Sequence, residues 1–202
     1  MNHLYEQLTA LKLTGFRDAL KKQLAQPGTY QELGFEERLS LLTAEELTCR
    51  ENRKAERLIK HARFRLNAEL SKLDYRNNRG LDRALIRSLS QGNWLTLKQN
   101  ILLTGATGSG KTFLACALGH NACRQGYKVY YYRLKALMEQ CYQGHADERY
   151  SKLLTRLNNS DLLLLDDWGL EPLSSEQRSD LLEIVDLMYQ RGSIIVVSQL
   201  PV

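Results

Sequence analysis

Apolar residues recur every three to four positions through residues 1–87, where β-branched residues and chain breakers are scarce. This spacing places the apolar side chains on one face of an amphipathic helix. Leu4, Leu8 and Leu11 begin such a face, and Pro27 with the glycine after it marks a turn farther along. The pattern therefore predicts an all-α first domain over residues 1–87.

The longest helical tract is predicted over residues 44–73, where Thr43 followed by Glu46 resembles a capping box. At 100° per residue, cationic side chains fall on one side of this helix and apolar side chains fall on the other. One face can therefore pack while the opposite face carries positive charge. The cationic face consists of Arg50, Arg53, Lys54, Arg57, Lys60 and His61. A turn at 77–80 and a short helix at 82–88 follow.

After residue 99 the pattern changes to short apolar runs that alternate with helical runs. Strands are predicted at 101–104, 128–132, 162–165 and 193–198, and helices at 112–124, 134–141 and 174–191. The last of these helices opens with a capping signal at Ser174 and Gln177. Strands that alternate with helices form a parallel sheet flanked by helices. Residues 88–202 are thus predicted to be a second domain of the α/β class.

The composition is that of a globular protein with enough apolar material for a core. Of the 202 residues, 43% are hydrophobic and 25% are charged. The sequence has no run of eighteen apolar residues and no secretory signal, so we expect a cytoplasmic protein with no membrane partner. The four cysteines form no CxxC pair and accompany no His cluster, which predicts reduced, buried thiols.

The positive charge of the chain is concentrated in one segment. Residues 49–87 contain twelve basic and five acidic residues, whereas the segments before and after them are acidic or balanced. Such a local excess indicates a polyanionic partner more strongly than an even bias would. The cationic helix face is a candidate for contacts with nucleic-acid phosphates. An ordinary solvated helix face remains the alternative.

The segment Gly105-Ala106-Thr107-Gly108-Ser109-Gly110-Lys111-Thr112 fits the phosphate-binding pattern GxxxxGK[ST]. It stands where this motif must stand, between a predicted strand and a predicted helix. Glycines let backbone N–H groups turn toward phosphate oxygens, and the helix N-terminus favours the same anion. Lys111 is expected to reach the β- and γ-phosphates, and the hydroxyl of Thr112 to bind Mg²⁺. The predicted ligands are ATP and Mg²⁺.

A second motif follows about fifty residues later. Four leucines at 162–165 predict a buried strand that ends in Asp166 and Asp167. A carboxylate at that strand end, beside a phosphate loop, is the Walker B arrangement. Asp166 is then the acid on the Mg²⁺ side, and Asp167 is the candidate that orients or deprotonates the attacking water. An ordinary strand followed by an acidic turn is the alternative.

Two further features are less specific. Gln199 follows the last predicted strand, where a polar side chain can contact the γ-phosphate or the water, although a surface turn fits equally well. Tyr130, Tyr131 and Tyr132 could form a platform that stacks on bases. Their place on a predicted buried strand favours packing in the core.

With these motifs in order, the chain resembles the IstB family of helper ATPases of insertion-sequence transposition, which is related to the DnaC helicase loaders within the AAA+ group. The resemblance covers nearly the whole chain. It is carried by Leu-Leu-Thr-Gly-Ala-Thr-Gly-Ser-Gly-Lys-Thr at 102–112, Leu-Leu-Leu-Asp-Asp-Trp-Gly-Leu at 163–170 and Ser-Gln-Leu-Pro-Val at 198–202. The segment 50–64 also resembles the helical N-terminal region of the family.

The resemblance implies an AAA+ P-loop NTPase core after a helical domain that helps to bind double-stranded DNA. It also implies ATP-dependent homo-oligomers on DNA and a partner transposase. By the same resemblance, 105–112 is the Walker A motif, Asp166 and Asp167 form Walker B, and Gln199 lies at the sensor-1 region. The second acidic residue of the family pattern is itself Asp, which supports a catalytic role for Asp167.

The chain departs from the family pattern at its end. Family members continue beyond the position of Val202 with another strand, a helix and an arginine that reaches a neighbour's ATP site. The resemblance therefore implies a C-terminally truncated core with an unpaired strand edge at 101–104. Two other functions stay open at this point. One is a helicase loader, and the other is a DNA-binding module that binds ATP without hydrolysing it.

Overall fold

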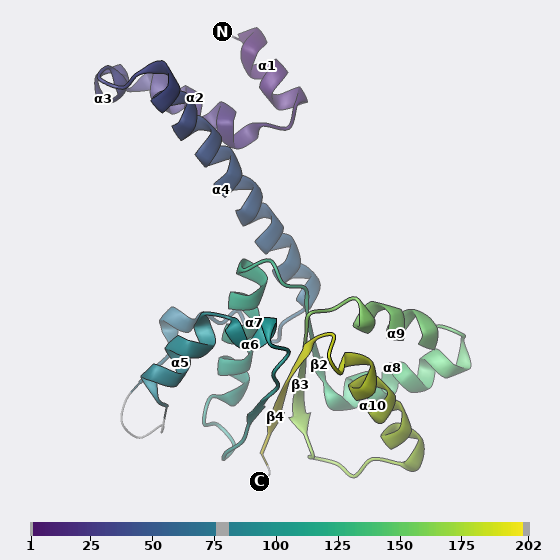
Figure 1. Ribbon diagram of the computed structural model, residues 1–202. Helices are drawn as coiled ribbons and strands as arrows, with labels where there is room; N and C mark the ends of the chain where they lie inside the picture. Colours follow the sequence, from purple (N-terminus) through teal and green to yellow (C-terminus); the bar gives the residue numbers. More distant parts are fainter. Residues whose placement is uncertain (1, 76–80, 200–202) are drawn as a thin grey trace. The chain divides into compact units, whose positions relative to one another are not determined.

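The chain forms two compact units. The computed structural model describes residues 2–75 and 81–199 (Figure 1). The first unit runs to Ala55 and the second begins at Glu56, so the division falls within helix α4 (Phe35–Ala62). The predicted domain boundary lies between residues 87 and 88, where the sequence pattern changes from helical to alternating. The division by packing lies earlier, between Ala55 and Glu56. The predicted turn at 77–80 lies outside the described residues.

The first unit is helical, as its periodicity predicts. Its helices are α1 (Asn2–Ala10), α2 (Thr14–Ala25), α3 (Pro27–Tyr30) and the first part of α4. Helices α2 and α4 approach closely at Gly15, where a Cβ atom would lie 2.7 Å from the Cβ of Cys49. The buried carboxylate of Glu46 accepts hydrogen bonds from the backbone N–H of Phe16 at 3.1 Å and from Arg50 Nε at 2.7 Å. The hydrogen bond from Arg50 is the main cause that lowers the pKa of Glu46.

Helix α4 corrects two details of the sequence-based prediction. It is one helix from Phe35 to Ala62, whereas a helical tract that begins near Phe35 and a separate helix over 44–73 were expected. Thr43 is not an N-cap, because it lies inside the helix and its Oγ1 donates to the backbone oxygens of Leu39 and Ser40. Ser and Thr hydroxyls bond in this way to the preceding turn of a helix that continues through them. A capping pattern therefore occurs here without a helix start.

The second unit contains a four-stranded parallel sheet in the order β1-β4-β3-β2. Its strands are β1 (Ile101–Leu103), β2 (Val129–Arg133), β3 (Leu162–Trp168) and β4 (Ser193–Ser198). The register pairs Leu164 of β3 with Tyr131 of β2 and with Ile195 of β4. Within the part of the chain that the structure describes, β1 pairs with β4 alone.

Helices cover the sheet of this unit, and the connections between parallel strands run through them. They are α5 (Arg83–Ser90), α6 (Asn93–Thr96), α7 (Lys111–Arg124), α8 (Leu134–Ala146), α9 (Tyr150–Asn158) and α10 (Ser175–Met188), with a 3₁₀ helix η1 (Leu70–Lys72). Helix α10 opens with the capping box predicted at Ser174 and Gln177. Helix α9 was not predicted. Among the described residues, no helix is both long and apolar enough to cross a membrane.

The core of the second unit has two layers, one on each face of the sheet. Leu162 and Leu164 belong to the layer that contains α7, whereas Leu163 and Leu165 belong to the layer that contains α8, α9 and α10. This alternation follows from the period of two in a strand, and all four leucines are fully buried. The predicted α/β architecture is confirmed, with strand β3 inside the sheet and two aspartates near the C-terminal end of this strand.

Candidate functional site

The glycine-rich segment 105–112 forms the loop between β1 and the start of α7. Gly105, Gly108 and Gly110 have φ angles of 144°, 77° and 95°, a region that side-chain-bearing residues rarely adopt. A Cβ atom on Gly108 would meet no atom within 4 Å, so the backbone of the loop faces open space. The loop and the first turn of a fourteen-residue helix thus offer backbone N–H groups to an anion.

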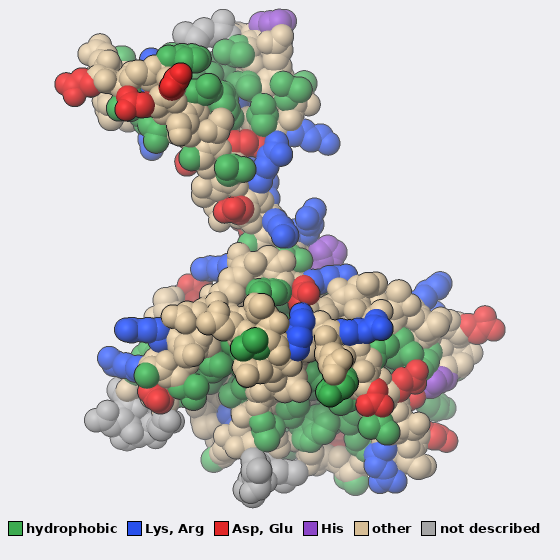
Figure 2. Space-filling view, in the orientation of Figure 1, with side chains coloured by type: hydrophobic (Ala, Val, Ile, Leu, Met, Phe, Trp, Pro, Cys, Tyr) green, Lys and Arg blue, Asp and Glu red, His purple; other side chains and the backbone are tan. Residues whose placement is uncertain are grey.

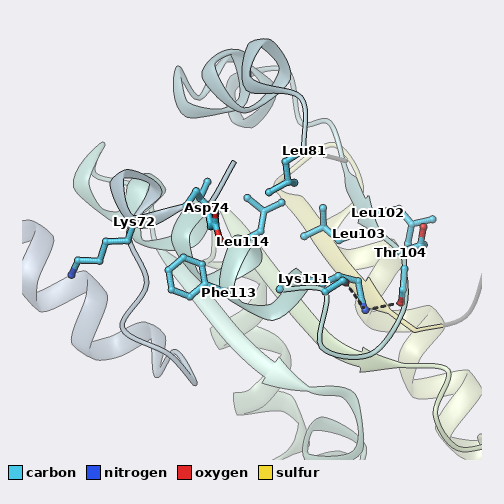
Figure 3. Close-up of a pocket in the computed structure, with 13 residues that line it drawn as sticks. Lys72, Asp74, Leu81, Leu102, Leu103, Thr104, Lys111, Phe113 and Leu114 are labelled. Atoms are coloured by element: carbon cyan, nitrogen blue, oxygen red, sulfur yellow. Dashed lines mark hydrogen bonds between the residues drawn. The ribbon is translucent and has the colours of Figure 1, made fainter. Parts of the chain in front are cut away.

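Lys111 folds back over this loop (Figure 3). Its Nζ donates to the backbone oxygens of Gly105 at 2.7 Å and Ala106 at 2.8 Å, and lies 3.4 Å from Ser109 Oγ. These are neutral acceptors. Phosphate oxygens at the mouth of the loop would offer the same ammonium group acceptors of opposite charge, which add Coulomb attraction to the hydrogen bonds.

Asp166 is buried at the end of β3 and collects three hydrogen bonds. Its Oδ1 accepts from Thr112 Oγ1 at 3.2 Å and from the backbone N–H of Asp167 at 2.9 Å, and its Oδ2 accepts from Tyr131 OH at 2.7 Å. Burial raises the pKa of the Tyr131 phenol, and its hydrogen bond to Asp166 raises it further. The phenol therefore stays protonated and holds the carboxylate in place, with one oxygen toward Thr112.

Thr112 and Asp166 are a donor set that fits Mg²⁺. This ion takes oxygen ligands in a small octahedral shell and usually binds through one or two protein groups plus substrate phosphates. A hydroxyl and a carboxylate oxygen that already lie 3.2 Å apart at the mouth of the phosphate loop meet this requirement. The structure thus brings together the two residues that the sequence proposes as metal ligands.

Asp167 leaves the regular strand. Its φ angle is 60°, and the pairing of β3 with β4 shifts between Leu165 and Trp168. Arg133 Nε donates to Asp167 Oδ2 at 2.6 Å, and Arg65 Nη1 lies 3.8 Å from the same oxygen. The hydrogen bond to Asp167 raises the pKa of the Arg133 guanidinium. The change in backbone direction turns this carboxylate toward two arginines.

Sequence reasoning missed Arg65, Tyr131 and Arg133 as members of the site. Arg133 ends β2 and pairs in register with Asp166 on the neighbouring strand, a relation that requires the strand order. Tyr131 was expected only to pack in the core. It is buried as expected, but its hydroxyl carries the hydrogen bond to Asp166. Tyr130 and Tyr132 are half-buried on the same strand.

Gln199 lies against the phosphate loop. It follows β4 directly, and its Oε1 accepts a hydrogen bond from Thr107 Oγ1 at 2.6 Å. The structure therefore places this side chain at the loop rather than in a remote surface turn. Its predicted role at the γ-phosphate or the attacking water stays a prediction.

Two cavities flank the phosphate loop. One, of about 390 Å³, contains the catalytic candidates together with Arg65, Thr107 and Thr112. The other, of about 490 Å³, is shown in Figure 3 and has a largely apolar wall. That wall consists of Leu73, Leu81, Leu102, Leu103, Phe113 and Leu114. Lys111 lines both cavities, and the lining of the second cavity also includes the polar residues Lys72, Asp74 and Thr104.

The basic residues predicted to contact DNA all lie on α4 and are exposed. Arg50 pairs with Glu46, and Arg53 Nη2 donates to Thr14 Oγ1, so both have partners inside the first unit. Lys54 also belongs to the first unit, whereas Arg57 and Lys60 belong to the second. Exposure fits the predicted role, which stays a prediction.

Comparison with known proteins agrees with this geometry. The family model described as IstB-like ATP binding protein matches residues 6–202. An insertion-sequence IS1162 ATP-binding protein of Pseudomonas fluorescens is 45% identical over 98% of this chain and 86% of its own length. An insertion-sequence ATP-binding protein of Sinorhizobium fredii is 42% identical over 98% of this chain and 80% of its own length.

Solved structures share the fold of the second unit. The DnaC helicase loader aligns over 67% of this chain and 79% of its own chain, with a TM-score of 0.58 and 27% identity. DnaA from Aquifex aeolicus, solved with the ATP analogue AMPPCP, aligns over 68% of this chain and 43% of its own, with a TM-score of 0.61 and 22% identity. The parallel sheet with its P-loop is therefore the AAA+ fold, and the chain belongs to the IstB-like ATP-binding protein family.

Proposed function

We propose that the chain is an ATP-dependent DNA-binding helper of insertion-sequence transposition that assembles on DNA and regulates a partner transposase. One observation carries the nucleotide part of this proposal. The start of α7 places the Lys111 ammonium and the Thr112 hydroxyl at the phosphate loop, and Thr112 Oγ1 lies 3.2 Å from the buried carboxylate of Asp166. This is the arrangement that a nucleoside triphosphate with its Mg²⁺ requires.

The two cavities suggest how ATP would lie. The apolar wall on one side of the loop suits the planar base, and the polar cavity on the other side suits the γ-phosphate and the attacking water. Lys111 would exchange its two backbone acceptors for phosphate oxygens. Bound Mg²⁺ would neutralise charge that develops on the phosphates, while Thr112 and Asp166 hold it in place.

Hydrolysis of ATP to ADP and phosphate would depend on Asp167 and Gln199. Asp167 would accept a hydrogen bond or a proton from the water, and Gln199 would help to position that water beside the loop. Arg133 Nε donates a hydrogen bond to Asp167 Oδ2 at 2.6 Å, and this bond would fix the position from which the carboxylate contacts the water. Positioning of this kind accounts for much of the catalysis in phosphoryl transfer.

The DNA part of the proposal is supported by charge and by the named relatives. Residues 49–87 carry twelve basic and five acidic residues, and the candidate contacts Lys54, Arg57 and Lys60 are exposed. Such residues bind backbone phosphates without reading sequence. Several relatives are described as insertion-sequence ATP-binding proteins, and this context suggests a transposase as the partner. We also propose that the chain forms homo-oligomers on DNA.

The test is the affinity for duplex DNA with and without ATP and Mg²⁺, measured at several salt concentrations. ATP is expected to tighten binding, and the affinity is expected to fall steeply with salt because counterions are released from the DNA. An affinity for duplex DNA that changes neither with ATP nor with the salt concentration would contradict the proposal.

The likeness to DnaC supports a helicase loader as a second candidate. The two functions share the ATPase core and differ in the partner, so affinity purification with a transposase and with a replicative helicase distinguishes them. Selective recovery of the helicase would favour the loader. Nucleotide binding without turnover, even on DNA, would instead favour a module that uses the ATPase fold as a scaffold.

A further inference from the structure

A basic cavity lies between α8 and α9, away from the phosphate loop. Its volume is about 330 Å³, and it shares no lining residue with either cavity at the loop. Four of its eight lining residues are cationic, and none is acidic. The lining consists of Arg63, Gln140, Gln143, Gly144, Arg149, Lys152, Leu153 and Arg156. In Figure 2, Lys and Arg side chains are visible over the α9 region of this unit.

Arg156 is fixed at the wall of this cavity. Its Nη2 donates to Gln140 Oε1 at 3.2 Å, and its guanidinium lies 5.8 Å and 5.9 Å from the ring centres of Tyr130 and Tyr132. Its Nε is buried and has no acceptor among the described residues. A guanidinium that is hydrogen-bonded to a neighbour and lies near two aromatic rings is oriented to bind an anion with little further loss of side-chain freedom.

The other three cations are exposed around the same cavity. Arg149 pairs with Asp147, which offsets part of its charge, whereas Arg63 and Lys152 have no ion-pair partner in the described part of the chain. Uncompensated like charges that converge on one cavity raise the free energy of the unliganded protein. An anion in the cavity would remove this cost.

We propose that the α8–α9 basic cavity binds a phosphate group of the DNA backbone. The inference rests on the proposed DNA-binding function and gives it a second contact, on the ATPase unit. Arginine and lysine donors suit a phosphodiester, and the absence of any carboxylate from the lining favours an anionic ligand. The position fits as well. Arg63 follows the end of α4 directly, after the exposed cations Arg57 and Lys60 of the same unit.

The test uses the full chain and a labelled duplex of random sequence, with a non-hydrolysable ATP analogue and Mg²⁺. The double variant carries Arg63→Asn and Lys152→Gln. Asn is chosen because Arg63 has a φ angle of 56°, a region that Asn adopts more readily than most residues. Fluorescence anisotropy is followed between about 50 and 200 mM salt.

Loss of the contacts to this one phosphate is expected to weaken binding at about 0.1 M salt by about tenfold. The slope of log affinity against log salt concentration should become shallower by about 0.9. The matched control carries Lys98→Asn and Arg178→Gln, which removes the same charge from positions outside the described cavities, and Lys98 also has a positive φ angle of 55°. The control should lose much less affinity. Both variants should bind the ATP analogue and unfold as the wild type does.

Equal duplex affinity and equal salt slope in the cavity variant and its control would overturn the inference. A third variant, Lys54→Gln with Arg57→Gln, distinguishes failure of the cavity inference from failure of the proposed DNA-binding function. If only this third variant weakens duplex binding, the chain binds DNA but the cavity does not contribute to the DNA-binding surface. If the wild type binds no duplex, both proposals are wrong. If inorganic phosphate binds in the cavity but the cavity variant has the same affinity for duplex DNA as the wild type, the ligand is a free anion and the inference is also wrong.

Discussion

At the scale of single residues, the site depends on how Asp166 and Asp167 are held apart. The two aspartates are neighbours in sequence, but Asp166 is buried and bonded to Tyr131 and Thr112, while Asp167 accepts a hydrogen bond from Arg133. Arg65 Nη1 is near both carboxylates, at 4.0 Å from Asp166 Oδ2 and 3.8 Å from Asp167 Oδ2. The positive φ angle of Asp167 produces this separation. One carboxylate is therefore available to a metal ion, and the other to a water molecule.

Replacing Tyr131 by Phe is expected to weaken the use of Mg²⁺. The change removes the hydrogen bond to Asp166 Oδ2 and leaves that buried carboxylate less firmly oriented. Partners of metal ligands typically contribute about 10- to 100-fold in metal affinity, so the Mg²⁺ concentration required for nucleotide binding should rise by about tenfold or more. Titration with Mg²⁺ at fixed ATP measures this shift. Tyr142→Phe, at a tyrosine that is 73% exposed, is the matched control and should behave as the wild type.

Replacing Arg133 by Gln is expected to lower turnover without affecting ATP binding. Arg133 contacts Asp167 and does not line the polar cavity at the loop, so its loss frees the carboxylate but leaves the phosphate contacts intact. We expect kcat of the DNA-bound protein to fall by about tenfold or more, with KM nearly unchanged. Steady-state ATPase kinetics check this, with partial rescue expected from Arg133→Lys. A rise in KM at constant kcat would show that Arg133 acts on binding instead.

At the scale of elements, strand β3 and helix α7 position the whole site. All four leucines of β3 are buried and alternate between two core layers, which fixes where the aspartates leave the sheet. Helix α7 begins at the phosphate loop with Lys111 and packs closely against Phe64, in the segment after α4. Its Gly119 leaves no room for a side chain, because a Cβ atom there would lie 2.5 Å from Phe64 Cε1.

Gly119→Ala is therefore expected to destabilise the second unit, although alanine is the better helix former. Overpacking of this kind typically costs about 1–3 kcal/mol in the free energy of unfolding. Denaturant unfolding monitored for the second unit measures the loss. Phe64→Leu removes the atoms that would clash, so the double variant should lose less than the sum of the two single changes. Strict additivity would mean that the contact is not the cause.

The sequence predicts elements well where a pattern repeats and poorly where it does not. The strands and helices around the P-loop follow from apolar runs and from the capping residues of α10. Helix α9 was missed although Leu153, Leu154 and Leu157 recur at helical spacing, because the helix is only nine residues long and its apolar positions fill barely more than one turn. The contacts of Arg133 and Arg65 with Asp167 were also missed. They depend on strand order and on a backbone turn that no local pattern encodes.

At the scale of the whole molecule, the two compact units have separate buried cores. Both hydrophobic clusters of the sheet lie within the second unit, while Leu8 and Leu42 are buried in the first. All the nucleotide-site residues also belong to the second unit. Binding of ATP is therefore coupled directly to the stability of that unit.

ATP with Mg²⁺ is expected to protect amides of the second unit from hydrogen exchange more than those of residues 2–55. A ligand at about 100 times its Kd stabilises the folded form by about 2.7 kcal/mol, which slows exchange through global opening by about 100-fold. Exchange measured by mass spectrometry on the full chain, with and without nucleotide, reports both units at once. Equal protection of both units would show that they unfold together.

The most direct test of the account is calorimetric titration of the protein with ATP and Mg²⁺, for the wild type and for Lys111→Ala. The variant loses the ammonium group at the phosphate loop, and the loss of such charged hydrogen bonds should weaken binding by about tenfold or more. Lys135→Ala, which removes an exposed lysine of the same unit, is the matched control. We expect one site per chain, with a Kd that rises by about tenfold or more in Lys111→Ala and is unchanged in the control. Equal affinity in all three proteins would contradict it.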